Sequence, residues 1–243
     1  MGKIDITTTA SLRPDILGRT LKSIRGNVKT SNDFRLIIDI APVGDKMYSQ
    51  DMVEKIARNY VDDIIVRKLA KSLQAEAIKW AWGQVRSDVF LHWEDDWVAT
   101  KGIDIDYLAE YIRESNNFAM IIFDRDDKSI LAKNTYSDGK FQYKGSGFWY
   151  KKYGFNFGGP PALINKKFAK KALKYLKDDE CLDITCRTEE SQSFLRKWEF
   201  AVWTGRDNKG SLISDIGKQW RKERGIKMVK RTPDGVRWVW NNA

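Results

Sequence analysis

Three adjacent carboxylates in the segment HWEDDWV, residues 92–98, are the most distinctive chemical feature of the sequence. Glu94, Asp95 and Asp96 directly follow an apolar run and have a tryptophan on each side. Hard cations such as Mg²⁺ and Mn²⁺ bind one or two protein carboxylates and complete their shell with substrate phosphates and water. The segment predicts a site, walled by the tryptophans, that holds such an ion against a nucleotide diphosphate. The alternative is a solvated turn or strand-end cap that binds nothing.

Few other side chains in the sequence can perform metal or acid–base chemistry. His92 is the single histidine, and Cys181 and Cys186 are the two cysteines, so no zinc-type cluster can form. No stretch approaches the roughly 18 apolar residues of a membrane helix, and residues 1–14 lack the apolar core of an export signal. We therefore expect a reduced, cytoplasmic protein in which carboxylates do the acid–base or metal work.

The chain carries a net charge of +10, and the distribution of this charge indicates a polyanionic partner. Residues 139–177 contain ten lysines and no acidic residue, with ten aromatic residues interleaved among them. A second basic stretch, residues 217–231, carries seven lysines and arginines against one glutamate. Lysines neutralise phosphates and aromatic rings stack on unpaired bases at ~1–3 kcal/mol per base, so this composition favours a nucleic-acid surface. Sugar-binding surfaces are aromatic-rich as well, and some of these rings belong equally well in a core.

The first hundred residues alternate between apolar runs typical of buried strands and amphipathic segments typical of helices. After Pro14, Leu17, Leu21 and Ile24 recur at helical spacing, and Ser49 is suited to cap the second helix. The expected strands are residues 4–10, 34–42, 62–69 and 88–93, and the expected helices begin near residues 14, 50 and 73.

This alternation predicts βαβ units and a mostly parallel sheet. The acidic triplet then falls at the C-terminal end of a buried strand, which is the edge where open α/β sheets bind ligands. The position favours the metal site over the solvated turn.

The second half of the chain has a less regular pattern. Residues 148–165 contain too many glycines, prolines and aromatic residues for regular structure, so we interpret them as a shaped loop. The other expected elements are helices at 105–112, 166–177 and 188–198, strands at 118–123 and 200–205, and a hairpin that turns at Asp138-Gly139.

The chain resembles A-type-fold glycosyltransferases, closest to the family 2-like, nucleotide-sugar-dependent enzymes. The matching segments are ITTTASLRPDILGRTLKSI, RLIIDIAPVGD and AEAIKWAWGQVRSDVFLHWEDDW. HWEDDW is the most specific of them, and the match is good over residues 4–100 and loose beyond. The resemblance implies an α/β fold, a single Rossmann-like domain over residues 1–243 with a mostly parallel central sheet. Residues 1–100 would be the nucleotide-sugar-binding half ending in the acidic metal motif, and residues 101–243 a C-terminal acceptor-binding half with a basic tail.

The same resemblance implies roles for individual residues. Asp96 would bind Mn²⁺ or Mg²⁺, and Asp215 stands where many such enzymes have a metal-binding histidine that this chain lacks. Asp39 could equally be an acid that only caps a turn. Arg13 and Arg221 could be ordinary surface charges instead of binding the donor. The residues implied in nucleotide-sugar binding are Thr8, Ala10, Ser11, Arg13, Asp39, Glu94, Asp95 and Arg221.

Inverting members of this family place a carboxylate near the acceptor hydroxyl as a general base. Glu189 and Glu190 are the candidates here, and the sequence does not distinguish between them. The alternative is that they stabilise a helix, because acidic residues in a first turn complement the helix dipole.

The basic, aromatic-rich second half leads us to expect DNA as the acceptor, through a hydroxymethylated pyrimidine base, as in virus-encoded enzymes that act in the host cytoplasm. A base in a duplex must be extracted into a pocket for such chemistry. The alternatives are a glycan, lipid-linked or protein acceptor, a catalytically inactive nucleic-acid-binding module, and a metal-dependent nuclease. The residues expected to bind the acceptor are Trp149, Tyr150, Phe157, Gly158, Gly159, Lys166 and Lys167.

Overall fold

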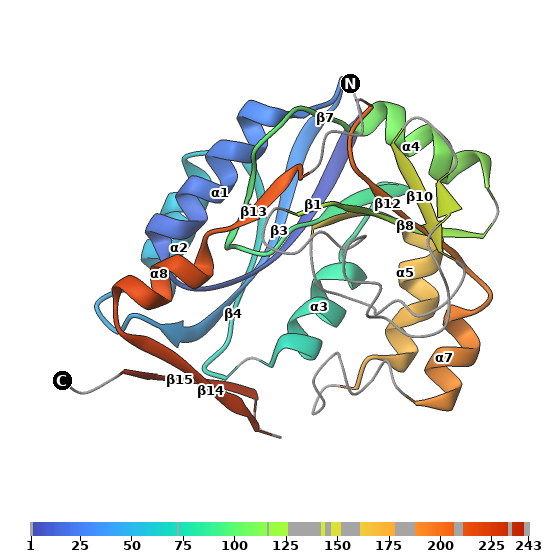
Figure 1. The fold of residues 1–243 in the computed structure, drawn as a ribbon. Helices are drawn as coiled ribbons and strands as arrows, with labels where there is room; N and C mark the ends of the chain where they lie inside the picture. The colour runs from blue at the N-terminus through green and yellow to red at the C-terminus, as the bar shows by residue number, and fades with distance from the viewer. Residues whose placement is uncertain are drawn as a thin grey trace.

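A twisted sheet of nine strands forms the centre of the computed structural model (Figure 1). Seven strands run in one direction, and β11 and β10 run against them. In spatial order the strands are β4 (Asp63–Lys68), β3 (Asp33–Gly44), β1 (Lys3–Leu12), β5 (Val89–His92), β11 (Ala162–Asn165), β8 (Phe118–Phe123), β12 (Glu199–Trp203), β10 (Phe148–Lys151) and β9 (Gln142–Tyr143). The structure describes residues 2–71, 73–115, 117–125, 142–143, 147–151, 161–177, 188–206, 211–232 and 235–240.

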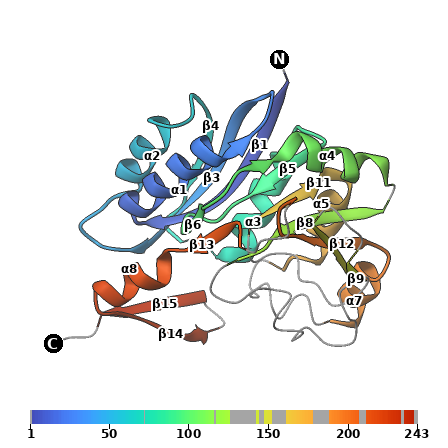
Figure 2. The same ribbon diagram turned by 45° about the horizontal axis from the view of Figure 1, so that its top comes forward.

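Helices cover both faces of this sheet and form a three-layer arrangement (Figure 2). One face packs against α1 (Pro14–Asn27), α2 (Gln50–Arg58) and α4 (Ile105–Glu114). The other face packs against α3 (Gln74–Gly83), α5 (Lys166–Ala172) with the 3₁₀ turn η1 (Leu173–Tyr175), and α7 (Glu189–Leu195). Along β3, β5 and β8 apolar side chains reach both faces, so the sheet separates two hydrophobic cores.

Three small two-stranded sheets surround the central one. They pair β2 (Val28–Lys29) with β7 (Ile103–Asp104), β6 (Trp97–Ala99) with β13 (Ile213–Asp215), and β14 (Ile226–Thr232) with β15 (Gly235–Trp240). Between β13 and β14, helix α8 (Gly217–Glu223) lies beside α1 at the end of the molecule that carries the acidic triplet (Figure 1). Within the described ranges, no helix has both the length and the apolar character that a membrane crossing requires.

The mostly parallel α/β fold expected from the sequence is confirmed, and Ser49 caps α2 by accepting a hydrogen bond from the Met52 amide. The prediction of a loop over 148–165 is wrong at both ends, where the chain forms β10 and β11. Residues 152–160 and the expected hairpin at 138–139 lie outside the described ranges. The sequence analysis missed β11 because ALIN is short and preceded by two prolines, whereas pairing with strands on both sides fixes it in the sheet.

Candidate active site

The acidic triplet lies where several chain segments meet at the carboxyl edge of the sheet. β5 ends at His92, and β1 and β3 run parallel beside it, so their carboxyl ends point to the same edge. After the triplet, β6 pairs antiparallel with β13, which places Asp215 opposite Trp97. The pairing brings a residue from near the C-terminus next to the motif.

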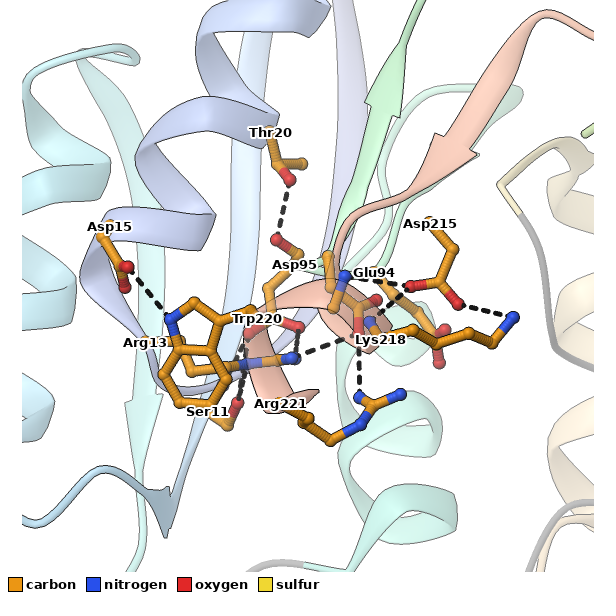
Figure 3. Close-up of polar contacts among 12 residues, drawn as sticks. Ser11, Arg13, Asp15, Thr20, Glu94, Asp95, Asp215, Lys218, Trp220 and Arg221 are labelled. Atoms are coloured by element: carbon orange, nitrogen blue, oxygen red, sulfur yellow. Dashed lines mark hydrogen bonds and ion pairs between the residues drawn. The ribbon is translucent and has the colours of Figure 1, made fainter. Parts of the chain in front are cut away.

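Asp95 is the buried centre of a hydrogen-bond network that joins the triplet to the start of α1 (Figure 3). Its Oδ2 accepts hydrogen bonds from the amide of Ser11 at 3.0 Å and from the Ser11 hydroxyl at 3.2 Å. Its Oδ1 lies 2.5 Å from Nη2 of Arg13, and its carbonyl oxygen accepts a bond from Thr20. Both carboxylate oxygens are therefore occupied by the protein, and Asp95 connects β1, α1 and the triplet.

Arg13 is a buried cation shared by two acids. Its side chain is 4% exposed, and its Nη1 lies 3.2 Å from Oδ2 of Asp96. Burial alone would lower the pKa of Arg13, but Asp95 and Asp96 raise it above the ordinary value. The ring of Trp220 lies 5.6 Å from the guanidinium and donates a hydrogen bond to Asp15 at 3.0 Å, which closes this side of the network.

Asp96 is partly exposed and has cations on two sides. Besides Arg13, Nη1 of Arg221 approaches its Oδ2 at 3.8 Å (Figure 3). Burial, together with Asp95 and Asp215, raises the pKa of Asp96 to about 6 against the opposing effect of Arg13. Burial is the largest cause of this shift, and the two neighbouring acids add to it.

Asp215 comes from β13, and its contacts start helix α8. Its Oδ1 accepts bonds from the amides of Gly217 at 2.9 Å and Lys218 at 3.2 Å, and its Oδ2 lies 3.1 Å from the Lys218 ammonium. The amide of Ile216 donates to the Asp96 carbonyl at 2.9 Å. These bonds hold the two predicted metal-binding acids close together.

Glu94 points to the α3 side, where it accepts a hydrogen bond from Gln74 at 3.0 Å. Burial, reinforced by Asp96 and Asp95, raises its pKa to about 8. Glu94 therefore keeps its proton to a higher pH than an ordinary glutamate does.

The tryptophans beside the triplet do not wall the site as the sequence suggested. Trp93 is fully buried, packs against Phe123 with ring centroids 5.7 Å apart, and donates to the Trp97 carbonyl at 2.8 Å. Trp97 is 5% exposed and belongs to the same core. Trp93 directly follows β5 and Trp97 is the first residue of β6, and both rings are buried in the core beside the motif.

Asp39, at the same edge, pairs with an arginine that the sequence did not single out. Nε of Arg67, on the adjacent strand β4, donates to the Asp39 carboxylate. Arg67 also contacts Glu76 at 3.1 Å and lies over the Trp80 ring, 4.9 Å from its centroid. Its Nη2 is buried without a hydrogen-bond partner among the described residues. An unsatisfied buried donor is costly, so this pair offers a donor to a ligand beside a carboxylate acceptor.

Thr8 and Ala10, the other residues predicted at the donor site, are buried in β1. Ala10 packs in the core, so only its backbone can contribute to binding. The Thr8 hydroxyl is buried and has no hydrogen-bond partner in the described part of the chain.

The residues predicted for the acceptor half are only partly described. Glu189 and Glu190 are exposed in the first turn of α7, and within the described ranges no hydrogen bond or ion pair joins them to the triplet. Lys166 donates to the Arg86 carbonyl at 2.5 Å and Lys167 is exposed. Phe157, Gly158 and Gly159, and the side chains of Trp149 and Tyr150, lie outside what the structure describes.

The oxygen donors at the triplet fit a hard divalent ion that arrives with its substrate. Among the residues described, no three Asp, Glu, His or Cys side chains converge into a ready ligand set. Asp96 and Asp215 lie close enough for Asp215 to raise the pKa of Asp96. Two carboxylates completed by phosphates and water are a usual arrangement for Mg²⁺ and Mn²⁺, so these two residues would hold the ion.

The strand order and the acidic motif after β5 define the A-type glycosyltransferase fold. No family model and no curated protein matches the sequence. Among solved structures, residues 1–349 of S. aureus TarS, a GT2-type glycosyltransferase, match with a TM-score of 0.57 at 12% identity, covering 89% of this chain and 60% of that one.

TarS in complex with UDP matches with a TM-score of 0.55, and in complex with UDP-GlcNAc with 0.53, each at 12% identity and over 88% of this chain. These matches cover 60% and 58% of the two TarS chains, so the chain spans less than two thirds of the length of these neighbours. At such identity the likeness establishes the fold.

Proposed function

We propose that this protein is a metal-dependent glycosyltransferase that moves a sugar from a nucleotide-diphosphate sugar to a hydroxyl acceptor. The observation that carries the proposal is the meeting of Asp96, Asp215 and Arg13 at the carboxyl edge of a parallel sheet. Such carboxylates suit a hard cation and arginine suits phosphate, and together they serve a diphosphate leaving group. The A-type fold supports the same conclusion.

The proposed donor is a uridine diphosphate sugar. A uracil ring offers an N–H donor beside a carbonyl acceptor, which complements the carboxylate of Asp39 and the unsatisfied Nη2 of Arg67. A buried polar site of this kind rejects bases that leave its groups unpaired. The UDP and UDP-GlcNAc complexes of TarS support this choice.

In the proposed reaction, the acceptor hydroxyl oxygen bonds to the anomeric carbon of the sugar as the bond from that carbon to the diphosphate oxygen breaks. The electron pair leaves with the diphosphate, and for an inverting reaction the hydroxyl proton passes to Glu190 or Glu189. Mn²⁺ or Mg²⁺ at Asp96 and Asp215 would neutralise the charge that develops on the diphosphate. Arg13 binds both Asp95 and Asp96 and so holds the Asp96 carboxylate beside that position.

The proposed acceptor is a hydroxymethylated pyrimidine base in DNA, and the surface of α5 supports it. Lys167, Lys170 and Lys171 are exposed on this helix, and Lys174 is exposed on η1. Tyr175 chiefly, and Glu190 as well, raise the pKa of Lys174, so the lysine row adjoins the proposed base. Neutralising phosphates releases counterions, so we expect DNA binding to weaken steeply with salt.

The test incubates the protein with Mn²⁺, a panel of nucleotide sugars, and DNA with plain or hydroxymethylated pyrimidines, followed by mass spectrometry of the digested nucleosides. We expect the mass of the hydroxymethylated nucleoside alone to increase by that of a hexose or a pentose. The increase should be absent with the Asp96→Asn variant and present with a surface control variant, Asp63→Asn. Donor hydrolysis without any gain on DNA would keep the transferase and replace the DNA acceptor by a glycan, lipid-linked or protein one. DNA binding without turnover of any donor would indicate the catalytically inactive module.

A further inference from the structure

We infer that Lys218 and Arg221 are diphosphate-binding residues that, without a donor, occupy the two carboxylates a divalent ion would use. The inference rests on the proposed function. It assigns each cation two alternative partners, a carboxylate in the free protein and a phosphate oxygen in the donor complex. The consequence is that these residues oppose binding of the metal ion alone and favour binding of the nucleotide diphosphate.

The two side chains lie on one face of α8 and reach different acids. Nζ of Lys218 lies 3.1 Å from Oδ2 of Asp215, and Nη1 of Arg221 lies 3.8 Å from Oδ2 of Asp96 (Figure 3). Residues three apart on a helix are neighbours on its surface. Each proposed metal-binding carboxylate thus already has its own cation from α8.

The backbone of α8 is fixed, so the two side chains can exchange partners without moving the helix. Ile216 and Trp220 pack with Ile16 of α1 in a small buried cluster. The indole of Trp220 donates to Asp15, and Arg224 contacts the same carboxylate at 3.3 Å. The side chains of Lys218 and Arg221 are 54% and 17% exposed.

Arg13, unlike Arg221, is held firmly by its partners. It is 4% exposed, donates to Ser11 at 2.7 Å, and contacts both Asp95 and Asp96. Arg221 approaches its acid at a distance beyond that of a hydrogen bond. We therefore expect Arg13 to keep its partners when a donor binds and Arg221 to change its partner.

The charges of the site determine the direction of the exchange. A divalent ion placed on Asp96 and Asp215 would repel the cations of Lys218 and Arg221 from those carboxylates. A diphosphate brings oxygens that accept charge-assisted hydrogen bonds, which arginine and lysine form readily. Removing either cation should therefore raise the affinity for the metal ion alone and lower the affinity for the nucleotide diphosphate.

The experiment measures the affinity for Mn²⁺ alone, and for UDP at saturating Mn²⁺, by isothermal titration calorimetry. The proteins are the wild type, Lys218→Gln, Arg221→Gln and, as a matched control, Lys222→Gln, which removes an exposed cation from the same helix. For the first two variants we expect Mn²⁺ to bind several-fold tighter and UDP to bind about tenfold or more weaker. The control should match the wild type.

Two results would overturn the inference while leaving the proposed function in place. If Arg221→Gln and Lys218→Gln weakened both ligands together, their role would be to support the fold of the site. If neither affinity changed relative to Lys222→Gln, the two residues would not be ligands at all. A wild-type protein that bound neither Mn²⁺ nor UDP would instead overturn the proposed function together with this inference.

Discussion

The carboxylate of Asp96 lies directly against Gly217, so closely that a β-carbon at position 217 would stand 2.7 Å from Cγ of Asp96. Real β-carbons do not approach neighbouring atoms so closely. The glycine therefore allows the first residue of α8 to pack against the acid that we propose as the main metal ligand. The backbone at Gly217 does not require glycine, because its φ lies outside the left-handed region.

We predict that Gly217→Ala reduces donor and metal binding without unfolding the protein. The added methyl group must displace the Asp96 carboxylate, since the α8 backbone is held by Asp215. A misplacement of about 1 Å can reduce activity about a hundredfold. Steady-state kinetics with a nucleotide sugar would measure the loss of activity, and thermal unfolding would show whether the variant is still folded.

Gly26→Ala is the matched control for this substitution. Gly26 lies in α1, and a β-carbon there would meet nothing within 4 Å. Alanine at this position should leave activity unchanged and stabilise the helix by about 0.5–1 kcal/mol. Full activity of Gly217→Ala would show that the Asp96 carboxylate has no fixed role.

Asp95 should be the member of the triplet on which folding depends most. Asp95→Ala leaves the guanidinium of Arg13 buried without its closest partner, and breaking such a pair costs about 3–5 kcal/mol. Denaturant unfolding would measure this loss. Asp63→Ala, which breaks an exposed pair with Lys3, should cost only about 0–1 kcal/mol. Equal losses for the two variants would contradict the structural role of Asp95.

The sequence predicted the fold of residues 1–100 better than that of the rest of the chain, for a physical reason. β1, β3 and β5 are apolar, β-branched and separated by amphipathic helices, so local periodicity identifies them. β11 and β13 are short and become strands only through partners distant in the chain. Pattern alone does not contain that information.

Arg67 should control the choice of nucleotide base. Arg67→Gln shortens the side chain and removes both its ion pair with Asp39 and its unsatisfied donor. We expect UDP affinity to fall about tenfold to a hundredfold and the preference for UDP over ADP to narrow. Competition binding with the two nucleotides would measure this.

Arg58→Gln is the control for Arg67, because Arg58 forms an exposed pair with Glu54 on α2. This variant should bind both nucleotides as the wild type does. An unchanged preference for UDP in Arg67→Gln would contradict the role of Arg67 in base recognition.

His92 should make the protein less stable in mild acid. Burial lowers its pKa to about 4, whereas the unfolded chain takes up the proton near pH 6.5. Stability from the neutral ring is complete above about pH 6.5 and is lost as the pH falls through about 4, by on the order of 3 kcal/mol in total. The amide of a His92→Gln variant cannot titrate, so this loss should disappear.

The measurement for His92 is the difference in unfolding free energy between the variant and the wild type from about pH 7.5 to pH 5. The difference is needed because Glu94, whose pKa is raised, has the opposite dependence on pH. The wild type should lose stability relative to the variant as the pH falls. Parallel curves would mean that His92 takes up its proton equally readily in the folded and the unfolded protein.

Within the candidate site, the sequence identified the acids better than the groups that orient them. HWEDDW could be found because carboxylates at a strand end are visible in the sequence. Asp215 was singled out because it stands where enzymes of the resembled family have a metal-binding histidine. The partner of Asp39 was not found, because nothing in the sequence distinguishes Arg67 from other strand residues. Only the pairing of β3 with β4 brings it beside Asp39. Gly217 carried no signal either, since its importance comes from a contact with residue 96.

The central claim is that Asp96 lets a nucleotide diphosphate leave, and the most direct measurement is metal-dependent release of UDP from a UDP-sugar. Wild type and Asp96→Asn would be compared with Mn²⁺ and with a chelator, after unfolding curves establish that both are folded. We predict that the wild type releases UDP, that chelation stops the release, and that Asp96→Asn stays at background while Arg13 keeps its bond to Asp95. Release of UDP by folded Asp96→Asn at the wild-type rate would contradict the account.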